Sequence, residues 1–303
     1  MNMPIEVKII EVGPRDGLQN EPTNLSTDKK IALIHKLVES GFKEIEATSF
    51  VNPKWIPNLA DAEEVIKAVR HLPATFFALV PNERGYNRAI QSGGGGVTFV
   101  LSATDSHCKK NLNSTTKESL NRLAPLVQRA QKDKVQYRAS LSTVFGCPFD
   151  GNPGIERIVQ IVGELKKMGF KRIGLCDTIG VANPVQVYTW MTKLKELYLD
   201  VEFELHFHDT YGRGLANVIA GLQAGVSSFD SSIGGLGGCP YAPGATGNIS
   251  TEDLASLLAE MGIETEINHS KMLETSNVLR EFIGKDLDSK IWRVNRASSS
   301  VHS

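Results

Sequence analysis

The sequence predicts an α/β protein of one fold class, a closed (β/α)8 or TIM barrel with a C-terminal helical extension. Three observations predict it. Short runs of branched and aromatic residues recur along the chain, helix-like stretches separate them, and there are eight such runs. Alternation of strands and helices predicts a parallel sheet, and eight units favour a closed barrel over an open doubly wound sheet. We therefore expect residues 1–303 to form a single barrel domain.

The first repeating unit shows the pattern most clearly. Residues 7–12 (VKIIEV) form a short branched apolar run, which is typical of a buried strand. The polar residues 26–28 then offer helix N-caps, and apolar residues follow at helical spacing as far as Val38. Gly41 supplies a helix stop. The remaining strands are predicted at residues 43–50, 75–80, 97–103, 137–142, 172–177, 203–208 and 227–232.

The chain continues beyond the eighth unit. From about residue 264 we expect one C-terminal helix, over about 269–283, and then the polar tail RASSSVHS, which we expect to fray. Within the barrel, the glycines at 93–96 are interpreted as a flexible turn, because they match no phosphate-binding loop pattern.

Composition narrows the functional class. Hydrophobic residues make up 41% of the chain and charged residues 22%, and the formal net charge is −1. This balance gives no broad attraction to nucleic acid or to a membrane. The N-terminus has no signal-peptide pattern, and no run of about 18 apolar residues is present. The four cysteines form no CxxC pair and are interpreted as free thiols, so we expect a cytoplasmic protein.

Unusual polar residues stand at the predicted strand ends, where the reactive groups of a (β/α)8 enzyme gather. Strand one is followed by Gly-Pro-Arg15-Asp16-Gly, and strand seven ends in His206-Phe-His208. Side chains two apart on a strand point the same way, so both imidazoles can reach one metal ion. A surface salt bridge is the alternative for the Arg15–Asp16 pair. A lone histidine is more often a core residue.

The run after strand eight, residues 234–248, contains six glycines and is too irregular for a helix. It is interpreted as an active-site loop that carries Cys239 and returns Asn248 to the barrel mouth, with a plain surface loop as the alternative. Strands seven, eight and one are neighbours in a closed barrel. The side chains that we expect to converge there are Asp16, His206, His208 and Asn248.

This donor set mixes two imidazoles, a carboxylate and an amide oxygen. It suits Mg²⁺ or Mn²⁺, although Fe²⁺ and Zn²⁺ are also compatible with such ligands. Two further carboxylates, Glu46 on strand two and Asp177 at the end of strand six, are candidates for acid–base work or for support of the ligands. The alternative for each is a structural contact with Arg15 or with a backbone amide.

Six motifs in the chain resemble those of 3-hydroxy-3-methylglutaryl-CoA lyases, over about residues 6–285. They are EVGPRDGLQNE (11–21), EATSFVNPKWIP (46–57), GCPFDG (146–151), DTIG (177–180), HFHDTYG (206–212) and GGLGGCPYAPGATGN (234–248). The glycine-rich run with its central cysteine is the most specific of them. The RDG and HxH patterns also occur in related metal-dependent Claisen-type synthases.

The resemblance implies a hydroxymethylglutaryl-CoA lyase of leucine degradation and ketone-body metabolism. Such an enzyme uses Mg²⁺ or Mn²⁺ to cleave its acyl-CoA thioester to acetyl-CoA and acetoacetate, and a homodimer is expected. The implied metal ligands are Asp16, His206, His208 and Asn248. The implied catalytic residues are Arg15 at the enolate oxygen, Glu46 to orient Arg15, Asp177 or His206 as proton acceptor, and Cys239 as proton donor or shield.

The chain departs from the family pattern in two places. Ser140 stands where the family commonly has tyrosine, and Gly174-Leu-Cys-Asp177 replaces Ser-Leu-Gly-Asp. The loss of an aromatic ring and of a hydroxyl would enlarge the acyl pocket. A lyase for longer 3-hydroxy-3-alkylglutaryl thioesters is therefore an open alternative.

Two other classes of function remain open. One is a Claisen-type synthase that condenses acetyl-CoA with a 2-oxo acid, and the other is a non-catalytic barrel that binds metal or acyl-CoA. The residues proposed to contact coenzyme A are Lys109, Lys110 and Asn111 after strand four, and a solvated loop is the alternative for them.

Overall fold

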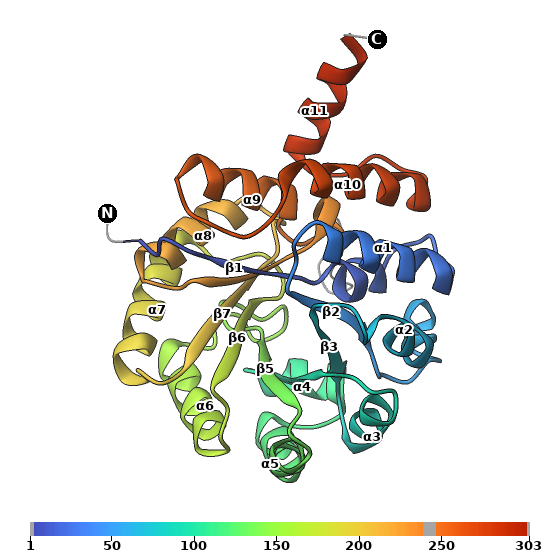
Figure 1. The fold of residues 1–303 in the computed structure, drawn as a ribbon. Coiled ribbons are helices and arrows are strands. Elements are labelled where there is room, and N and C mark those ends of the chain that lie inside the picture. The colour runs from blue at the N-terminus through green and yellow to red at the C-terminus, as the bar shows by residue number, and fades with distance from the viewer. Residues whose placement is uncertain (1–2, 239–246, 302–303) are drawn as a thin grey trace.

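The computed structural model describes residues 3–238 and 247–301. Eight parallel strands close into a barrel in chain order, and β1 pairs with β8 to complete the ring (Figure 1). The strands are β1 (Lys8–Glu11), β2 (Glu44–Ser49), β3 (Thr75–Val80), β4 (Gly96–Ser102), β5 (Gln136–Ser142), β6 (Arg172–Asp177), β7 (Glu202–Phe207) and β8 (Ser228–Ser231). The predicted closed barrel is confirmed, and each predicted strand agrees with the observed one to within one residue at each end.

Helices surround the strands and cover the outside of the barrel (Figure 1). They are α1 (Thr27–Glu39), α2 (Ala62–Val69), α3 (Glu83–Gln91), α4 (Asp105–Leu112), α5 (Thr116–Asp133), α6 (Ile155–Lys167), α7 (Pro184–Leu197), α8 (Gly214–Gln223), α9 (Thr251–Glu260), α10 (His269–Ile283) and α11 (Lys290–Val301). Two of them, α4 and α5, lie between β4 and β5, so this crossover is longer than the others.

The two faces of the barrel wall differ in polarity. Apolar side chains such as Ile45, Phe99 and Leu205 belong to the hydrophobic core that fills the space between strands and helices. The inner face instead carries buried charged side chains, including Arg138 and Glu204, which form an ion pair across the barrel interior. Because successive strand residues alternate between the faces, the register of neighbouring strands decides which polar residues meet.

The first helix shows how local sequence fixes the backbone. Ser26 occupies the N-cap position of α1 with an extended backbone, but its side chain makes no capping hydrogen bond. The helix ends just before Gly41, whose φ is 102°. A Cβ atom at Gly41 would lie 2.4 Å from the carbonyl oxygen of Glu266, so only glycine fits where the chain turns toward β2.

The C-terminal segment differs from the sequence-based expectation. The predicted helix at about 269–283 is present as α10, but the tail that was expected to fray continues as helix α11. Trp292 in its first turn is only 2% exposed, and the backbone N–H groups of Lys290 and Ile291 donate to the buried Asp253 carboxylate on α9. This anchored first turn explains the helix, and its later part points away from the barrel (Figure 1).

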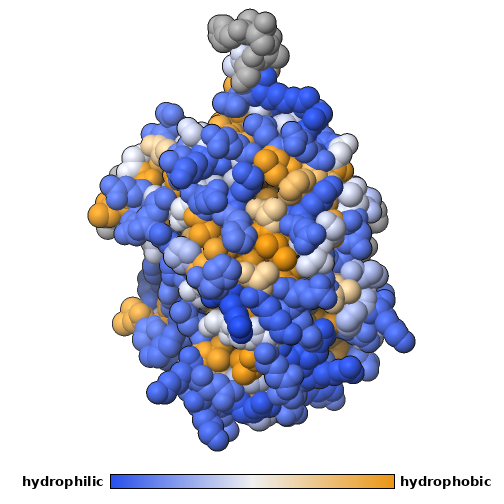
Figure 2. All heavy atoms as spheres, turned by 45° about the vertical axis from the view of Figure 1, so that its right-hand side comes forward, coloured by the Kyte–Doolittle hydropathy of each residue, from blue (hydrophilic) through white to orange (hydrophobic). Residues whose placement is uncertain are grey.

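The surface gives no sign of a membrane-spanning element in the described part of the chain. No described helix combines the length and the apolar composition that a bilayer crossing needs. Figure 2 shows a mostly hydrophilic face with separate hydrophobic patches.

Candidate metal centre and active site

The site begins in the turn that follows β1. Residues Gly13–Gly17 form one π-helical turn, a conformation that is often found at functional sites. Gly13 and Gly17 pack this turn tightly against the segment after β8, because a Cβ atom on Gly17 would lie 2.7 Å from the Ser232 hydroxyl oxygen. The turn therefore holds Arg15 and Asp16 at the mouth of the barrel.

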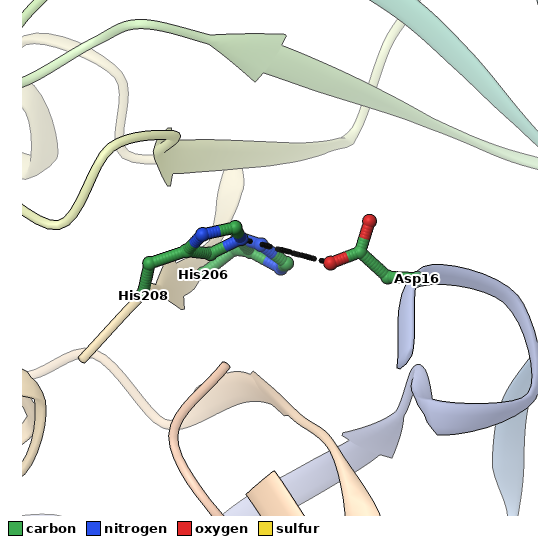
Figure 3. A group of neighbouring side chains, drawn as sticks. All are labelled: Asp16, His206 and His208. Carbon is green, nitrogen blue, oxygen red and sulfur yellow. Dashed lines mark ion pairs between the residues drawn. The ribbon is translucent and has the colours of Figure 1, made fainter. Parts of the chain in front are cut away.

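Asp16 faces the two histidines of β7. Figure 3 shows both imidazoles directed toward the Asp16 carboxylate from the opposite side of a gap. His206 Nε2 lies 3.9 Å and His208 Nε2 lies 3.6 Å from Asp16 Oδ2. The candidate ligand atoms of the three residues all lie within 4.8 Å of one another. The predicted convergence of these three side chains is thus observed.

Asn248 joins the same cluster. Its side-chain Nδ2 donates to Asp16 Oδ2 over 2.8 Å, and its backbone forms an isolated bridge with His208. Its position depends on the base of the glycine-rich loop. A Cβ atom on Gly247 would lie 2.6 Å from the backbone nitrogen of Gly237, so the two ends of the loop meet backbone to backbone.

The residues present fit a divalent cation. Separations of 3.6 and 3.9 Å are too long for hydrogen bonds, so the imidazoles do not satisfy the Asp16 carboxylate directly. Asn248 Oδ1 and His208 Nδ1 are buried without a hydrogen-bond partner among the described residues. Oxygen and imidazole donors in this mixture suit Mg²⁺, Mn²⁺ and other first-row divalent ions.

The electrostatics of the cluster favour the metal-binding forms of Asp16 and His208. Burial opposes ionisation of Asp16, but the Arg15 guanidinium and the two imidazoles outweigh it and hold its pKa well below the usual range. Burial lowers the pKa of His208, despite the opposing effect of Asp16. For His206, burial is outweighed by Asp230 and Asp16, and its pKa is raised. Asp16 is therefore a carboxylate and His208 a neutral imidazole near neutral pH.

Arg15 is fixed from behind by Glu46. Its Nε donates to Glu46 Oε1, and its Nη1 lies 2.5 Å from Asp16 Oδ1. Glu46 is fully buried, and it also accepts from Arg138 Nη2 at 2.7 Å. Although burial raises the pKa of Glu46, the two guanidiniums outweigh it and lower the pKa. The predicted contact between Glu46 and Arg15 is thus observed.

A cavity of about 440 Å³ opens above this cluster. Its base contains Arg15, Asp16, His206 and His208. Its wall combines the apolar side chains of Phe50, Leu79 and Val100 with the polar ones of Ser140, Ser142 and Thr178. Its rim includes Trp55, Arg84, Arg88 and Arg122. The cavity is large enough for a small acyl group, and the basic rim suits an anionic extension of the ligand.

The structure does not bring Asp177 to the cavity lining. Its two carboxylate oxygens accept the backbone N–H groups of Val181 and Ala182 at 2.9 and 3.0 Å. Burial raises its pKa to about 6 against these hydrogen bonds. The neighbour that does line the cavity is Cys176, which is in register with His206. Asp177 therefore supports the turn after β6.

Cys239 lies outside the described residues. The chain reaches the cavity just before it, since Gly238 belongs to the lining and its carbonyl oxygen accepts from Asn20 Nδ2 at 3.0 Å. The other three cysteines are free and buried, as expected.

The two departures from the family pattern have different surroundings. Ser140 lines the cavity, and its Oγ lies 3.3 Å from Cys176 Sγ. Gly174 is not part of the lining; a Cβ atom there would lie 3.3 Å from the Ala139 carbonyl oxygen and 3.9 Å from Glu204. The expectation of a larger cavity therefore applies to Ser140 and not to Gly174.

Of the three residues expected to contact coenzyme A, only Asn111 lines the cavity. The Lys110 ammonium instead lies over the Phe149 ring, 4.7 Å from its centroid. The basic groups at the rim come from Arg84, Arg88 and Arg122, which sequence analysis did not single out.

Two buried residues of the site were also missed, Arg138 on β5 and Asp230 on β8. Arg138 bonds Glu46 and Asp230, and Asp230 Oδ2 lies 3.1 Å from His206 Nδ1. A signal was present, because Arg138 shares its strand face with Ser140, and a charged residue on the inner face of a barrel strand is unusual.

Comparison with known proteins gives a consistent result. The family model described as HMGL-like matches residues 6–279. The hydroxymethylglutaryl-CoA lyase of Bacillus subtilis is 45% identical over 98% of this chain and 100% of its own, and the mitochondrial hydroxymethylglutaryl-CoA lyase of Macaca fascicularis is 41% identical over 95% and 89%.

Solved structures agree. The crystal structure of the Bacillus subtilis HMG-CoA lyase has a TM-score of 0.95 at 45% identity, covering 98% of this chain and 100% of the other. An HMG-CoA lyase from Acinetobacter baumannii in complex with coenzyme A and 3-methylmalate has a TM-score of 0.90 at 41% identity, covering 95% and 94%. By its family model, its sequence relatives and its fold, this chain belongs to the HMGL-like family of carbon–carbon lyases.

Proposed function

We propose that this protein is a divalent-metal-dependent lyase that cleaves 3-hydroxy-3-methylglutaryl-CoA to acetyl-CoA and acetoacetate. The observation that carries the proposal is the cluster of Asp16, His206 and His208 at the base of a cavity, with Arg15 beside it. The names of its relatives support the same reaction, and the Acinetobacter relative has coenzyme A bound.

Asp16, His206, His208 and Asn248 would hold Mg²⁺ or Mn²⁺. When bound there, the cation supplies Lewis-acid polarisation of the hydroxyl and carboxylate oxygens of the substrate. The fixed π-helical turn and the end of β7 hold these side chains at one place. They would thereby orient the bound substrate at the base of the cavity.

Cleavage needs an acceptor for the hydroxyl proton. His206 lines the cavity and Asp177 does not, so His206 is the better placed of the two candidates. It would take the proton on Nε2 while Asp16, His208 and Asn248 keep hold of the cation. As the proton leaves, the carbon–carbon bond breaks and its electron pair passes to the acetyl-CoA fragment, which forms an enolate. Asp177, turned away from the cavity, contributes by holding the turn that carries Thr178.

Arg15 would stabilise the enolate oxygen, because its guanidinium lines the cavity and is held by Glu46. Protonation of the enolate carbon then releases acetyl-CoA. We assign this proton, or the exclusion of water during the step, to Cys239, because the loop that bears it begins at the cavity lining with Gly238.

The coenzyme A portion would lie across the rim. Guanidinium groups of Arg84, Arg88 and Arg122 suit its phosphates, and Trp55, which is 74% exposed, offers a ring to its adenine. A role in leucine degradation, a homodimer and a cytoplasmic location complete the proposal. The Bacillus subtilis relative is a bacterial protein, and several other relatives are named as mitochondrial proteins.

The direct test is acetoacetate release from 3-hydroxy-3-methylglutaryl-CoA by reduced, metal-stripped protein, with and without Mg²⁺ or Mn²⁺. Release that depends on the cation is expected, and it should be lost in Cys239→Ser. Activity that is unaffected by chelation would contradict the proposal. A synthase would instead condense acetyl-CoA with a 2-oxo acid, and a non-catalytic barrel would bind without turnover.

A second candidate is a lyase for longer 3-hydroxy-3-alkylglutaryl thioesters. It is favoured by Ser140, a small side chain that lines the cavity beside its register partner Val100. Relative kcat/KM for the methyl and the longer alkyl substrates separates the two candidates.

A further inference from the structure

A ring of ion pairs and hydrogen bonds surrounds the base of the cavity. Each of its three carboxylates uses its two oxygens on two different basic side chains. Its members, in order, are Arg15, Glu46, Arg138, Asp230, His206 and Asp16. Five of the six contacts are 3.1 Å or shorter. The sixth, between His206 and Asp16, is 3.9 Å and is the place where the ring opens toward the candidate cation.

Two of the six members of this ring, Arg138 and Asp230, have no part in the chemistry described above. Arg138 lies beneath the cavity at 2% exposure, and Asp230 lies beside it at 8%. The Arg138 Nη2 donates to Glu46 Oε2 over 2.7 Å, and its Nη1 donates to Asp230 Oδ1 over 2.9 Å. One guanidinium therefore links the carboxylate behind Arg15 with the carboxylate behind His206.

All three guanidinium nitrogens of Arg138 donate hydrogen bonds. Its Nε donates to Thr98 Oγ1 at 3.1 Å, its Nη1 also donates to Glu204 Oε2 at 2.9 Å, and its plane lies over the Phe77 ring, 5.2 Å from the centroid. Lysine, a single point charge, could not bridge these acceptors. Arg138 thus has one orientation, and this orientation fixes the position of Asp230.

The contact between Asp230 and His206 has a chemical consequence. Asp230 Oδ2 lies 3.1 Å from His206 Nδ1. A carboxylate can only accept, so Nδ1 must carry the proton. In the neutral ring the lone pair then resides on Nε2, the nitrogen that faces Asp16.

His208 provides an internal contrast. Its Nδ1 is buried and has no hydrogen-bond partner among the described residues. Only one of the two clustered imidazoles therefore has a carboxylate behind it. His206 is held in tautomer and in ring orientation, whereas His208 is held by its strand and its bridge to Asn248.

A contribution to folding stability does not explain why this ring of charged side chains is buried. Burying charged groups is costly, and apolar side chains of similar volume often stabilise a core equally well or better. The interior of a barrel of this kind is usually filled with branched apolar residues. A role in holding the site explains why the six ionisable groups of the ring lie inside the barrel.

We propose that Asp230 is a positioning residue that keeps the proton of His206 on Nδ1 and its lone pair on Nε2, and that Arg138 holds Asp230 for this purpose. This role concerns the metal centre described above and rests on the proposed function. Asp230 contacts the proposed metal ligand His206, Arg138 contacts Asp230, and neither residue lines the cavity.

The first test needs no metal, and a variant only to assign the signal. The tautomer of His206 is determined in metal-free wild-type protein, labelled with ¹⁵N-histidine, from long-range proton–nitrogen correlations at alkaline pH. The seven histidines are few enough to assign by comparison with His206→Gln. A proton on Nδ1 is expected. A proton on Nε2 would overturn the proposal.

The second test compares two variants, each of which neutralises one carboxylate that accepts a hydrogen bond from Nη1 of Arg138. Asp230 and Glu204 both accept from Nη1 at 2.9 Å, but only Asp230 is hydrogen-bonded to His206. Mn²⁺ affinity is measured by the loss of the free-ion electron paramagnetic resonance signal. We expect Asp230→Asn to weaken binding about 10–100-fold and Glu204→Gln by less than about threefold.

The outcomes are separable. Unchanged Mn²⁺ affinity in Asp230→Asn, or an equal loss in both variants, would overturn the positioning role. Circular dichroism of both variants shows whether they are folded, and the wild-type tautomer decides the question if Asp230→Asn is not. If wild-type protein binds no Mn²⁺ at all, the proposed function fails, while the tautomer still tests Asp230 separately.

Discussion

The Nε of Arg15 donates to the Glu46 carboxylate, which is completely buried behind it. The same guanidinium lines the cavity and contacts Asp16 through Nη1. The Arg15 guanidinium is therefore held in one orientation before substrate binds, and it lines the cavity where the enolate oxygen would form. Pre-oriented donors of this kind contribute mainly to the transition state and not to substrate binding.

Arg15→Gln should consequently lower kcat about 10²- to 10³-fold with a smaller change in KM. Steady-state kinetics with saturating Mn²⁺ measures both constants. Arg84→Gln, at the rim of the same cavity, is the matched variant and should raise KM more than it lowers kcat. A kcat within threefold of wild type for Arg15→Gln would exclude a role in charge stabilisation.

The cation should also stabilise the fold, because its candidate ligands come from segments far apart in the chain. A ligand at 100 times its Kd that binds only the folded state adds about 2.7 kcal/mol to the free energy of unfolding. We expect Mn²⁺ to raise the Tm of wild-type protein, with no rise in Asp16→Asn. Asp177→Asn, a buried carboxylate outside the cluster, should keep the rise. Calorimetry with and without chelator gives the comparison, and a Tm rise in Asp16→Asn would place the cation elsewhere.

The contrast between Asp16 and Asp177 shows what sequence could predict. Eight apolar runs predicted the eight strands of the barrel. Because side chains alternate along a strand, His206 and His208 were predicted to lie on the same side of the chain at the end of β7. The same rule applies to β6, where Asp177 shares its face with Ile173 and Leu175, both fully buried in the core. Its position outside the cavity could therefore have been predicted from alternation alone.

Other features depended on contacts that no local pattern contains. Asp230 meets His206 because β7 and β8 pair in one particular register, and Arg138 reaches both Glu46 and Asp230 across the barrel interior. Helix α11 depends on Asp253, more than 30 residues earlier in the chain. The assignment of residues 1–303 to a single domain stays a prediction.

A pH-dependent stability is expected from Glu11. This side chain is fully buried, accepts from the backbone of Gly13 and Ile233 and from the hydroxyl of Thr251, and its pKa is raised by burial from 4.5 to about 8 against these hydrogen bonds. The folded state thus binds the proton more tightly than the unfolded state. The stability that this provides is complete below about pH 4.5 and is lost as the pH rises through about 8.

Glu11→Gln imitates the protonated side chain and does not titrate. Between pH 6 and 8 the free energy of unfolding of wild type should fall, relative to this variant, by about 1.4 kcal/mol per pH unit. Urea unfolding at pH 6, 7, 8 and 9 provides the two curves. Parallel curves over this range would mean that Glu11 is already ionised at pH 6.

The anchored first turn of α11 makes a local prediction. Asp253 accepts from Ser289 Oγ at 2.8 Å and from the backbone N–H of Ile291 at 2.9 Å, so it satisfies the start of the helix. Asp253→Ala should cost about 0.5–2 kcal/mol and should speed amide hydrogen exchange over residues 290–296. Lys290→Ala is the control, because its ammonium is exposed and lies 3.8 Å from Asp253. Equal exchange in wild type and Asp253→Ala would show that Trp292 alone anchors the helix.

The width of the cavity at Ser140 gives the last prediction. Ser140 and Cys176 lie side by side in the lining, and a larger side chain at position 140 would fill space that a 3-alkyl group would otherwise occupy. One methylene in an apolar pocket changes kcat/KM by about 10- to 200-fold. Ser140→Tyr should therefore reduce kcat/KM at least tenfold for substrates with a 3-alkyl group longer than methyl, and much less for the methyl substrate. Gly174→Ala, outside the lining, should leave this ratio unchanged. If Ser140→Tyr lowers kcat/KM equally for both substrates, position 140 does not set the preferred chain length.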